Sequence, residues 1–238
     1  IESRARISTY VGNPLLQRLK IMPTIAAIVE RLDNGVGQVL SKLDELKLRD
    51  NTMVIFYSDN GGKETFARQD PLRSGKGWLY EGGIRVPLVI RWPGHTDPGS
   101  TTDHLMTTVD LFPTFLELLG DKDVPGDLDG ESFLGVLKGQ AAATQRTLYW
   151  HYPHYHVGSG MVPAGAIRQG RYKLIEWFEG TVAGSGREHQ LFDVVEDISE
   201  SRELSGSHPR AADRLKAELE AWRSRVGAQM PIPNPKRQ

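Results

Sequence analysis

The chain has 238 residues, a formal net charge of −1 and no cysteine. Its 39% hydrophobic and 25% charged residues are ordinary for a globular protein, and its length allows one or two domains. The near-zero charge gives no electrostatic case for nucleic-acid binding or for a basic membrane-binding patch. Without cysteine, disulfides indicate nothing about the compartment. No apolar run reaches the length of a membrane span.

The first residue is isoleucine rather than methionine, and no signal peptide is visible. We therefore expect a processed or truncated product. Residues 1–22 show no clear period and are predicted to form a surface connection. From Pro23 to Leu46, apolar residues recur every three or four positions, which predicts a helix. Gly35 and Gly37 lower helix propensity, and a close approach to a sheet would account for them.

Residues 53–62 read MVIFYSDNGG, a short apolar run that passes into polar residues and two glycines. Such a run predicts a strand buried on both faces of a parallel sheet. Ligands bind just beyond the carboxyl ends of strands in such sheets, and Asp59 and Asn60 occupy that point. A carboxylate and an amide carbonyl are hard oxygen ligands, suited to Ca²⁺ or Mg²⁺. The glycines allow a sharp turn and leave room for an ion.

A second motif follows in residues 72–87, LRSGKGWLYEGGIRVP. It predicts a glycine-rich loop that carries Lys76 and leads into another buried strand, residues 86–92. A lysine on a glycine loop is a common contact for anions, because its ammonium acts as a point charge. A metal-ligating pair and an anion-binding lysine therefore lie within one short segment.

Residues 58–62 (SDNGG), 75–77 (GKG) and 80–87 (YEGGIRVP) together resemble the motifs of the type I sulfatases of the alkaline phosphatase superfamily. Few families combine these motifs at this spacing, and the resemblance covers nearly the whole chain. It implies an α/β, alkaline-phosphatase-like fold. Taken without the resemblance, the motifs also fit a simple turn cap and a solvated lysine.

The resemblance implies roles for three residues. Asp59 and Asn60 would bind a calcium ion, and Lys76 would contact the sulfate. Type I sulfatases use a formylglycine nucleophile made from the first residue of a C/S-x-P-S-R motif, and this sequence contains neither cysteine nor x-Pro-Ser-Arg. We therefore expect the chain to be the C-terminal part of a sulfatase, to need the N-terminal half as a partner, and to be inactive alone.

The middle of the chain carries a second helical pattern, residues 105–119, which Pro113 should kink or restart. His104 and Asp110 beside it are interpreted as structural. Residues 120–130 are acidic and rich in turn-forming residues. They lack the order of an EF-hand loop, so a solvated loop is the preferred interpretation.

After about residue 145 the pattern changes to short strand candidates, followed by a helix. The predicted strands are residues 148–150, 165–169, 172–178 and 190–194, and the predicted helix is residues 209–226. This part resembles the small C-terminal subdomain of sulfatases, an antiparallel sheet with one helix across it. We therefore divide the chain into residues 1–145, part of the main α/β domain, and residues 146–238, the subdomain.

Residues 150–156, WHYPHYH, interleave three histidines with aromatic residues. Imidazoles bind zinc, but neither a cysteine nor a well-placed carboxylate accompanies them. Aromatic faces suit stacking on sugar rings, and imidazoles suit hydrogen bonds to hydroxyls or sulfate. We predict that His151 and His154 face the substrate, with packing roles as the alternative. The glycine-rich residues 157–165 are interpreted as a mobile lid.

The resemblance thus implies a sulfuric ester hydrolase with calcium and formylglycine, and the residue 150–156 segment indicates a sulfated carbohydrate as substrate. A noncatalytic sugar-sulfate-binding or structural protein remains an alternative because the nucleophile is missing. A phosphatase or phosphodiesterase of the superfamily is a second alternative, but Lys76 and the following Glu81-Gly82-Gly83 argue against it. By resemblance, the location would be periplasmic, secreted or lysosomal.

Overall fold

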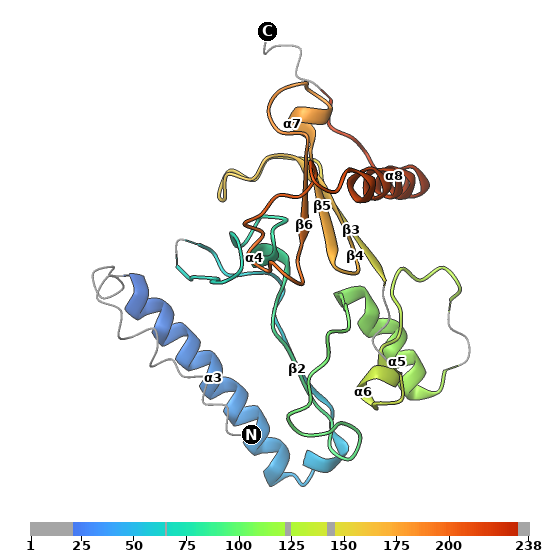
Figure 1. Ribbon diagram of the computed structural model, residues 1–238. Coiled ribbons are helices and arrows are strands. Elements are labelled where there is room, and N and C mark those ends of the chain that lie inside the picture. Colours follow the sequence, from blue (N-terminus) through green and yellow to red (C-terminus); the bar gives the residue numbers. More distant parts are fainter. Residues whose placement is uncertain (1–20, 65, 122–124, 142–145, 233–238) are drawn as a thin grey trace.

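The computed structural model describes residues 21–64, 66–121, 125–141 and 146–232, and Figure 1 shows how its helices and strands are arranged. In chain order the elements are α3 (Ile21–Glu45), η1 (Arg49–Asn51), β1 (Val54–Tyr57), α4 (Glu81–Ile84), β2 (Leu88–Arg91), η2 (Thr108–Asp110), α5 (Leu111–Leu119), α6 (Leu134–Leu137), β3 (Thr147–Tyr152), β4 (Ala164–Gln169), β5 (Tyr172–Trp177), α7 (Phe178–Thr181), β6 (His189–Asp193) and α8 (Pro209–Val226). The predicted connection over residues 1–22 lies almost entirely outside the described residues.

The C-terminal sheet is an antiparallel meander in the order β3-β4-β5-β6. Alternation along its strands sends neighbouring side chains to opposite faces. On β5, Leu174 packs toward α8 with Leu215 and Leu219, whereas Ile175 packs on the other face with Tyr80. Figure 1 shows α8 and α4 on either side of these strands. The predicted sheet with one helix across it is confirmed, and α8 has the predicted bounds.

The core on the other face of this sheet joins the two halves of the chain. Leu79 and Tyr80, from the segment before α4, are buried with Trp177, Phe192 and Val194 of the C-terminal part. The glycine-rich segment is therefore seated directly on the sheet. The division of the chain at residue 145 stays a prediction.

The strand that ends at Tyr57 differs from its prediction. Strand β1 pairs with β2 in an antiparallel ladder, Val54 opposite Arg91 and Tyr57 opposite Leu88, and its residues are exposed or half-buried. The expected parallel pairing, buried on both faces, is wrong for the described residues. A parallel return needs a long crossover, usually a helix. In the described residues of this connection the only helix is the single turn of α4, and the chain reverses instead.

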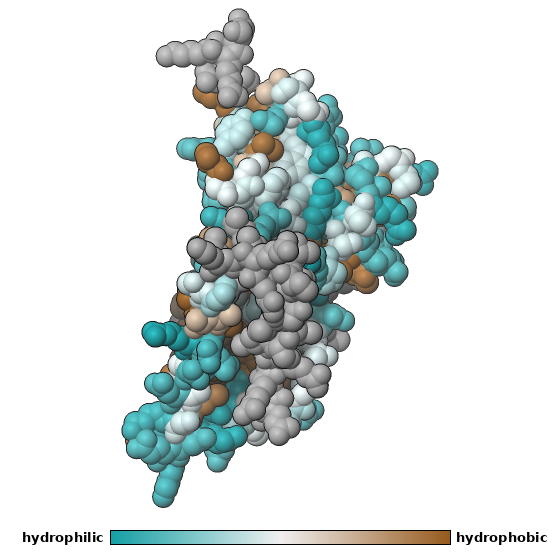
Figure 2. All heavy atoms as spheres, turned by 90° about the vertical axis from the view of Figure 1, so that its left-hand side faces the viewer, coloured by the Kyte–Doolittle hydropathy of each residue, from teal (hydrophilic) through white to brown (hydrophobic). Residues whose placement is uncertain are grey.

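The helix predicted from residue 23 is α3, and its extent is confirmed. Its apolar residues Ile28, Leu32 and Val39 are exposed among the described residues. A Cβ built at Gly35 or Gly37 meets no described atom within 4 Å, so the expected close approach to a sheet is not found. Figure 2 shows this side of the molecule, where hydrophilic atoms surround scattered hydrophobic ones. Across the described ranges, no helix combines the length and apolarity needed to cross a membrane.

Asp110 has the structural role predicted for it. It is fully buried, accepts the backbone N–H of Thr107 at 2.6 Å and that of Glu131 at 2.9 Å, and pairs with Arg146 at 2.7 Å. It therefore ties the start of α5 to the chain that enters β3. The helix predicted over residues 105–119 begins only at Leu111, after η2, and Pro113 sits in the first turn of α5, where a missing N–H removes no helical hydrogen bond.

Candidate functional site

The loop after β1 holds the predicted metal ligands. Asp59 is exposed and Asn60 is half-buried. The Ser58 hydroxyl donates to the Asn60 carbonyl oxygen at 3.0 Å, and the Ser58 N–H donates to Pro87 O at 3.4 Å. The pair is thus presented to solvent from a short loop whose backbone is anchored to the chain entering β2.

Lys76 lies on the neighbouring loop, with an exposed side chain. Its backbone N–H donates to Gly62 O at 2.9 Å, while the Gly61 N–H donates to Gly83 O at 3.0 Å. These two hydrogen bonds place the loop with Asp59 directly beside the loop with Lys76. The structure therefore brings the two predicted motifs together.

Glycine is required where these loops touch. A Cβ at Gly61 would lie 1.7 Å from Gly82 O, and a Cβ at Gly75 would lie 2.3 Å from Gly62 O. Backbone meets backbone at both points, so neither contact leaves room for a side chain. The glycines keep the two loops at a fixed separation, which preserves the relative position of Asp59 and Lys76.

A third segment contacts the lysine loop, and it contains a histidine that the sequence analysis did not select. A Cβ at Gly77 would lie 2.7 Å from the Ser159 hydroxyl oxygen and 2.8 Å from His156 Nδ1. The same Nδ1 lies 2.8 Å from the Ser159 hydroxyl, and the His156 N–H donates to Met161 O at 2.9 Å. The run of alternating histidines and aromatics gave no signal that distinguishes His156. Only the turn at residues 156–161 places His156 against Gly77, the residue next to Lys76.

His151 and His154 occupy different surroundings. His151 Nε2 lies 2.8 Å from Gln229 O, and its ring lies 5.6 Å from that of Phe178. Along β3 it alternates with Trp150 and Tyr152, which pack against the core containing Tyr80. His151 therefore lies on the face turned away from the lysine loop, a position that suits packing. His154 is exposed, with its ring 4.1 Å from that of Tyr152. Their contacts with a substrate stay predictions.

Behind the lysine loop lies a buried ionic cluster. Lys173 Nζ is 2.9 Å from Glu81 Oε1 and 2.7 Å from Glu200 Oε1, and all three side chains are almost fully inaccessible. Glu200 Oε2 also accepts the Glu81 backbone N–H at 2.6 Å. Arg73 donates to Glu200 O at 2.8 Å. The cluster thus joins both ends of the segment around Lys76 to the C-terminal sheet.

The pKa values of the two carboxyls in this cluster shift in opposite directions. Burial alone would raise the pKa of Glu81, but the charges of Lys173 and Arg168 outweigh it and lower that pKa. Burial raises the pKa of Glu200, and Lys173 offsets only part of the rise. Glu81 belongs to the predicted motif over residues 80–87, but nothing in the sequence spacing pointed to Lys173 or Glu200.

The donor chemistry of the Asp59–Asn60 pair fits a calcium ion in part. Calcium takes about six to eight oxygen ligands, and this pair offers one carboxylate and one amide oxygen. Within the residues that the structure describes, no group of three or more His, Asp or Glu side chains is placed to hold a metal. The pair therefore suits a contribution to a metal site that other groups complete.

Comparison with known proteins decides the family. The family model described as "N-sulphoglucosamine sulphohydrolase, C-terminal" matches residues 74–225, and the one described as "Sulfatase" matches residues 3–121. The chain belongs to the sulfatase family. The expected family membership is thereby confirmed.

Individual sulfatases show the extent of the likeness. The chain is 34% identical to a sulfatase of Formosa agariphila over 83% of its own length and 39% of that protein. It is 32% identical to the steryl-sulfatase of Mus musculus, over 83% and 37% of the two chains. The crystal structure of Ps i-CgsB in complex with k-i-k-neocarrahexaose matches with a TM-score of 0.74 and 32% identity, covering 86% of this chain and 44% of that one.

This structural match confirms the expected sulfatase fold for the C-terminal part. The chain spans about two fifths of the length of the curated sulfatases it matches. That coverage agrees with the expectation that the sequence corresponds to a C-terminal portion, and with the absence of the C/S-x-P-S-R motif from it.

Proposed function

We propose that this chain supplies part of the calcium and sulfate site of a sulfuric ester hydrolase. The observation that carries the proposal is the pair of backbone hydrogen bonds, Gly61 to Gly83 and Lys76 to Gly62, that holds the Asp59–Asn60 loop beside the Lys76 loop. Two oxygen ligands and a cation at one solvent-exposed edge form an arrangement suited to an anionic ester.

Each residue has a distinct task in this proposal. Asp59 and Asn60 contribute oxygen ligands to calcium, which would polarise a sulfate oxygen. Lys76 places its ammonium against sulfate oxygens and offsets the negative charge that develops during ester cleavage. The glycine contacts hold both loops rigid, so little reorganisation is needed. Formylglycine, the expected nucleophile, would come from the N-terminal half, which is the proposed partner of this chain.

For the substrate we propose a sulfated carbohydrate. The support is the exposed His154, whose ring lies 4.1 Å from that of the half-buried Tyr152, together with the oligosaccharide bound to the similar protein Ps i-CgsB. The match to a steryl-sulfatase shows that family membership alone does not select a carbohydrate. A periplasmic, secreted or lysosomal location belongs to the same proposal.

The test uses a polypeptide that joins this chain to an N-terminal half bearing the nucleophile motif. Lys76→Ala should lower kcat/KM for a sulfate ester by about 10²-fold or more, as expected for the loss of a preorganised electrostatic contact. Because the Lys76 side chain is exposed, Tm should stay within a degree or two of the parent value. Lys63→Ala, which removes an exposed lysine from the preceding loop, is the matched control and should leave kcat/KM unchanged.

Two results would overturn the proposal. One is near-normal turnover of the sulfate ester by the Lys76→Ala variant. The other is faster hydrolysis of the corresponding phosphate ester by the parent protein, which would favour the phosphatase alternative. In addition, the 238-residue chain by itself should show no metal-dependent turnover of a chromogenic aryl sulfate.

A further inference from the structure

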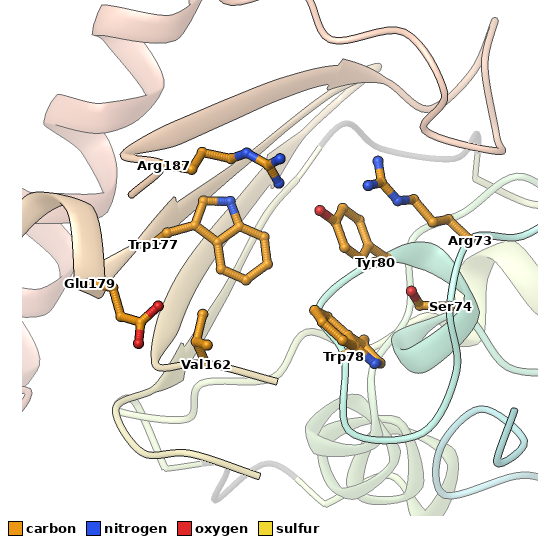
Figure 3. Close-up of a pocket in the computed structure, with 8 residues that line it drawn as sticks. All are labelled: Arg73, Ser74, Trp78, Tyr80, Val162, Trp177, Glu179 and Arg187. Carbon is orange, nitrogen blue, oxygen red and sulfur yellow. The ribbon is translucent and has the colours of Figure 1, made fainter. Parts of the chain in front are cut away.

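A pocket of about 290 Å³ opens between the lysine-loop segment and the C-terminal sheet. Figure 3 shows that its walls come from both parts of the chain. The residues that define its chemistry are three aromatic residues, two arginines and one carboxylate: Trp78, Tyr80, Trp177, Arg73, Arg187 and Glu179. Lys76 does not line it, so this pocket is separate from the calcium and sulfate site proposed above.

Three aromatic rings form its apolar wall. The centroid of Tyr80 lies 5.8 Å from that of Trp78 and 5.8 Å from that of Trp177, and the two tryptophans lie 6.4 Å apart. Tyr80 and Trp177 are buried and support the wall, whereas Trp78 is half-buried and offers an apolar surface to a ligand. The volume is close to the lower end of small-molecule pockets, so it suits a single ring rather than an extended chain.

One glutamine holds these rings in place. The Oε1 atom of Gln190 accepts the Tyr80 hydroxyl at 2.6 Å, Trp177 Nε1–H at 3.1 Å and Arg187 Nη1–H at 3.0 Å. Gln190 itself is buried. The wall is therefore formed before any ligand arrives, which reduces the conformational entropy lost on binding.

Charges of opposite sign occupy opposite ends of the pocket. In Figure 3, Arg73 and Arg187 lie at one end and Glu179 at the other. The Arg73 guanidinium lies 4.0 Å above the Tyr80 ring and donates one N–H to Glu200 O. Arg187 donates one N–H to Gln190. An arginine has five N–H donors, so both arginines retain donors for an anion.

The other end of the pocket offers a hydrogen-bond acceptor. The Glu179 carboxylate accepts the Tyr155 hydroxyl at 2.8 Å, and its oxygens can accept further hydrogen bonds from a ligand.

The backbone at the pocket edge is also unusual. Ser74, which lines the pocket, has a φ of 59°, a left-handed conformation that non-glycine residues rarely adopt. Such conformations persist where the surrounding structure demands them, and they gather at ligand-binding sites. Ser74 lies between Arg73, which lines the pocket, and Lys76, which is exposed two residues later.

We propose that this pocket is an accessory site for one sulfated sugar residue. The sulfate lies between Arg73 and Arg187, the apolar face of the sugar ring packs on Trp78, the least buried ring of the wall, and a ring hydroxyl donates to Glu179. A polymeric substrate would then be held at two points, with the hydrolysed ester at Lys76 and a neighbouring residue here. The choice of sugar rests on the proposed function, but the existence of the pocket does not.

The test is an NMR titration of the ¹⁵N-labelled 238-residue chain, read at the indole N–H signals of its five tryptophans. The probe is N-acetylglucosamine 6-sulfate, and the comparison ligands are N-acetylglucosamine and inorganic sulfate. The Trp78 and Trp177 signals should shift with a Kd of about 1 mM or below. Trp92, stacked on His95, and Trp222, stacked on Tyr149, should not move. Unsulfated sugar and inorganic sulfate should each bind at least about tenfold more weakly.

Variants identify the residues responsible. Arg187→Ala removes an exposed cationic side chain and should weaken the sulfated sugar about tenfold. Arg210→Ala, at the exposed start of α8, is the matched control and should bind normally. Lys76→Ala should also retain these shifts, so failure of the proposed hydrolase site and failure of this pocket are distinguishable.

Three outcomes would overturn the proposal. The first is no shift of Trp78 and Trp177 up to tens of millimolar ligand. The second is equal shifts with inorganic sulfate alone, which would make this an anion site without sugar recognition. The third is unchanged affinity in Arg187→Ala and also in Trp78→Phe, a variant that keeps an aromatic ring while it reduces the stacking surface.

Discussion

Lys173 Nζ lies 2.9 Å from Glu81 Oε1, although the two residues are 92 positions apart and both side chains are buried. Glu81 begins α4, immediately after the loop of Lys76, and Lys173 lies on β5. The contact therefore fixes the loop proposed to contact the sulfate against the C-terminal sheet. Glu200 shares the same lysine, so one buried ammonium faces two carboxylates, while Arg85 and Arg168 lie 3.5 Å from the other carboxylate oxygen of Glu81.

The first prediction concerns this cluster. Lys173→Met keeps an unbranched side chain as far as the ε position but leaves Glu81 and Glu200 buried without their shared ammonium. Removing one partner of a buried ion pair typically costs about 3–5 kcal/mol of the free energy of unfolding. Urea unfolding at neutral pH measures the change. Lys42→Met, in the exposed pair with Glu45, is the control and should cost less than about 1 kcal/mol. Equal effects of the two substitutions would contradict the assigned role of Lys173.

The second prediction is that the two glutamates of the cluster give stability opposite pH dependences. The lowered pKa of Glu81 means that its contribution is present above about pH 4.3 and is lost as pH falls through its folded pKa. The raised pKa of Glu200 means that its contribution is present below about pH 4.3 and is lost as pH rises through its folded pKa.

Chemical unfolding of Glu81→Gln and Glu200→Gln between pH 3.5 and about 7 checks these signs. The free-energy difference between the unsubstituted chain and Glu81→Gln should grow as pH rises. The corresponding difference for Glu200→Gln should shrink over the same range. Parallel trends in the two variants would show that the cluster does not separate the two pKa values.

The third prediction compares two glycines. Gly61→Ala would place a Cβ 1.7 Å from Gly82 O, so the two loops of the candidate site must move apart. We expect a loss of several kcal/mol in the free energy of unfolding and a large loss of calcium-dependent activity in the joined polypeptide. Gly35→Ala in α3 meets no described atom within 4 Å and should raise helix stability by up to about 1 kcal/mol. Thermal unfolding of both variants checks the contrast, and similar Tm changes of the same sign would refute it.

The fourth prediction concerns calcium. The 238-residue chain should bind it weakly or not at all, because Asp59 and Asn60 leave most of a shell of about six to eight ligands unfilled. The joined polypeptide should bind it clearly, and Asp59→Ala should weaken that binding. Isothermal titration calorimetry measures both quantities. The exposed Asp97→Ala variant is the control, and equal calcium affinity in the two variants would reject Asp59 as a ligand.

The fifth prediction separates the three neighbouring histidines. His154→Ala should raise KM for a sulfated saccharide in the joined polypeptide without a change in Tm, since the side chain is exposed. His151→Ala should lower Tm, because it removes the contact with Gln229 O. A rise in KM in this variant therefore indicates a substrate contact only if it exceeds what the loss of stability explains. His156→Ala should lower kcat/KM for a small aryl sulfate as well, because His156 lies against Gly77 beside Lys76. Unchanged kinetics in all three would assign the histidines to packing.

The sequence by itself determined the local elements and the identity of the motif. The helix from Pro209 to Val226, the four strands of the meander and the helix that ends at Glu45 all follow from periodicity, because side chains repeat every 3.6 residues in a helix and every two in a strand. Asp59, Asn60 and Lys76 were found because their glycine-rich loops have a recognisable residue order. The family comparison agrees with that reading.

Tertiary structure decided which distant residues meet. The antiparallel pairing of β1 with β2, the contact of His156 with Gly77, and the cluster of Lys173 with Glu81 and Glu200 depend on how the chain returns to itself after long intervals. Periodicity assigns a side chain to a face but does not say which face of which neighbour it will contact. For that reason the sequence pointed to His151, on the face of β3 turned away from the lysine loop, and passed over His156, which the turn at residues 156–161 brings beside it.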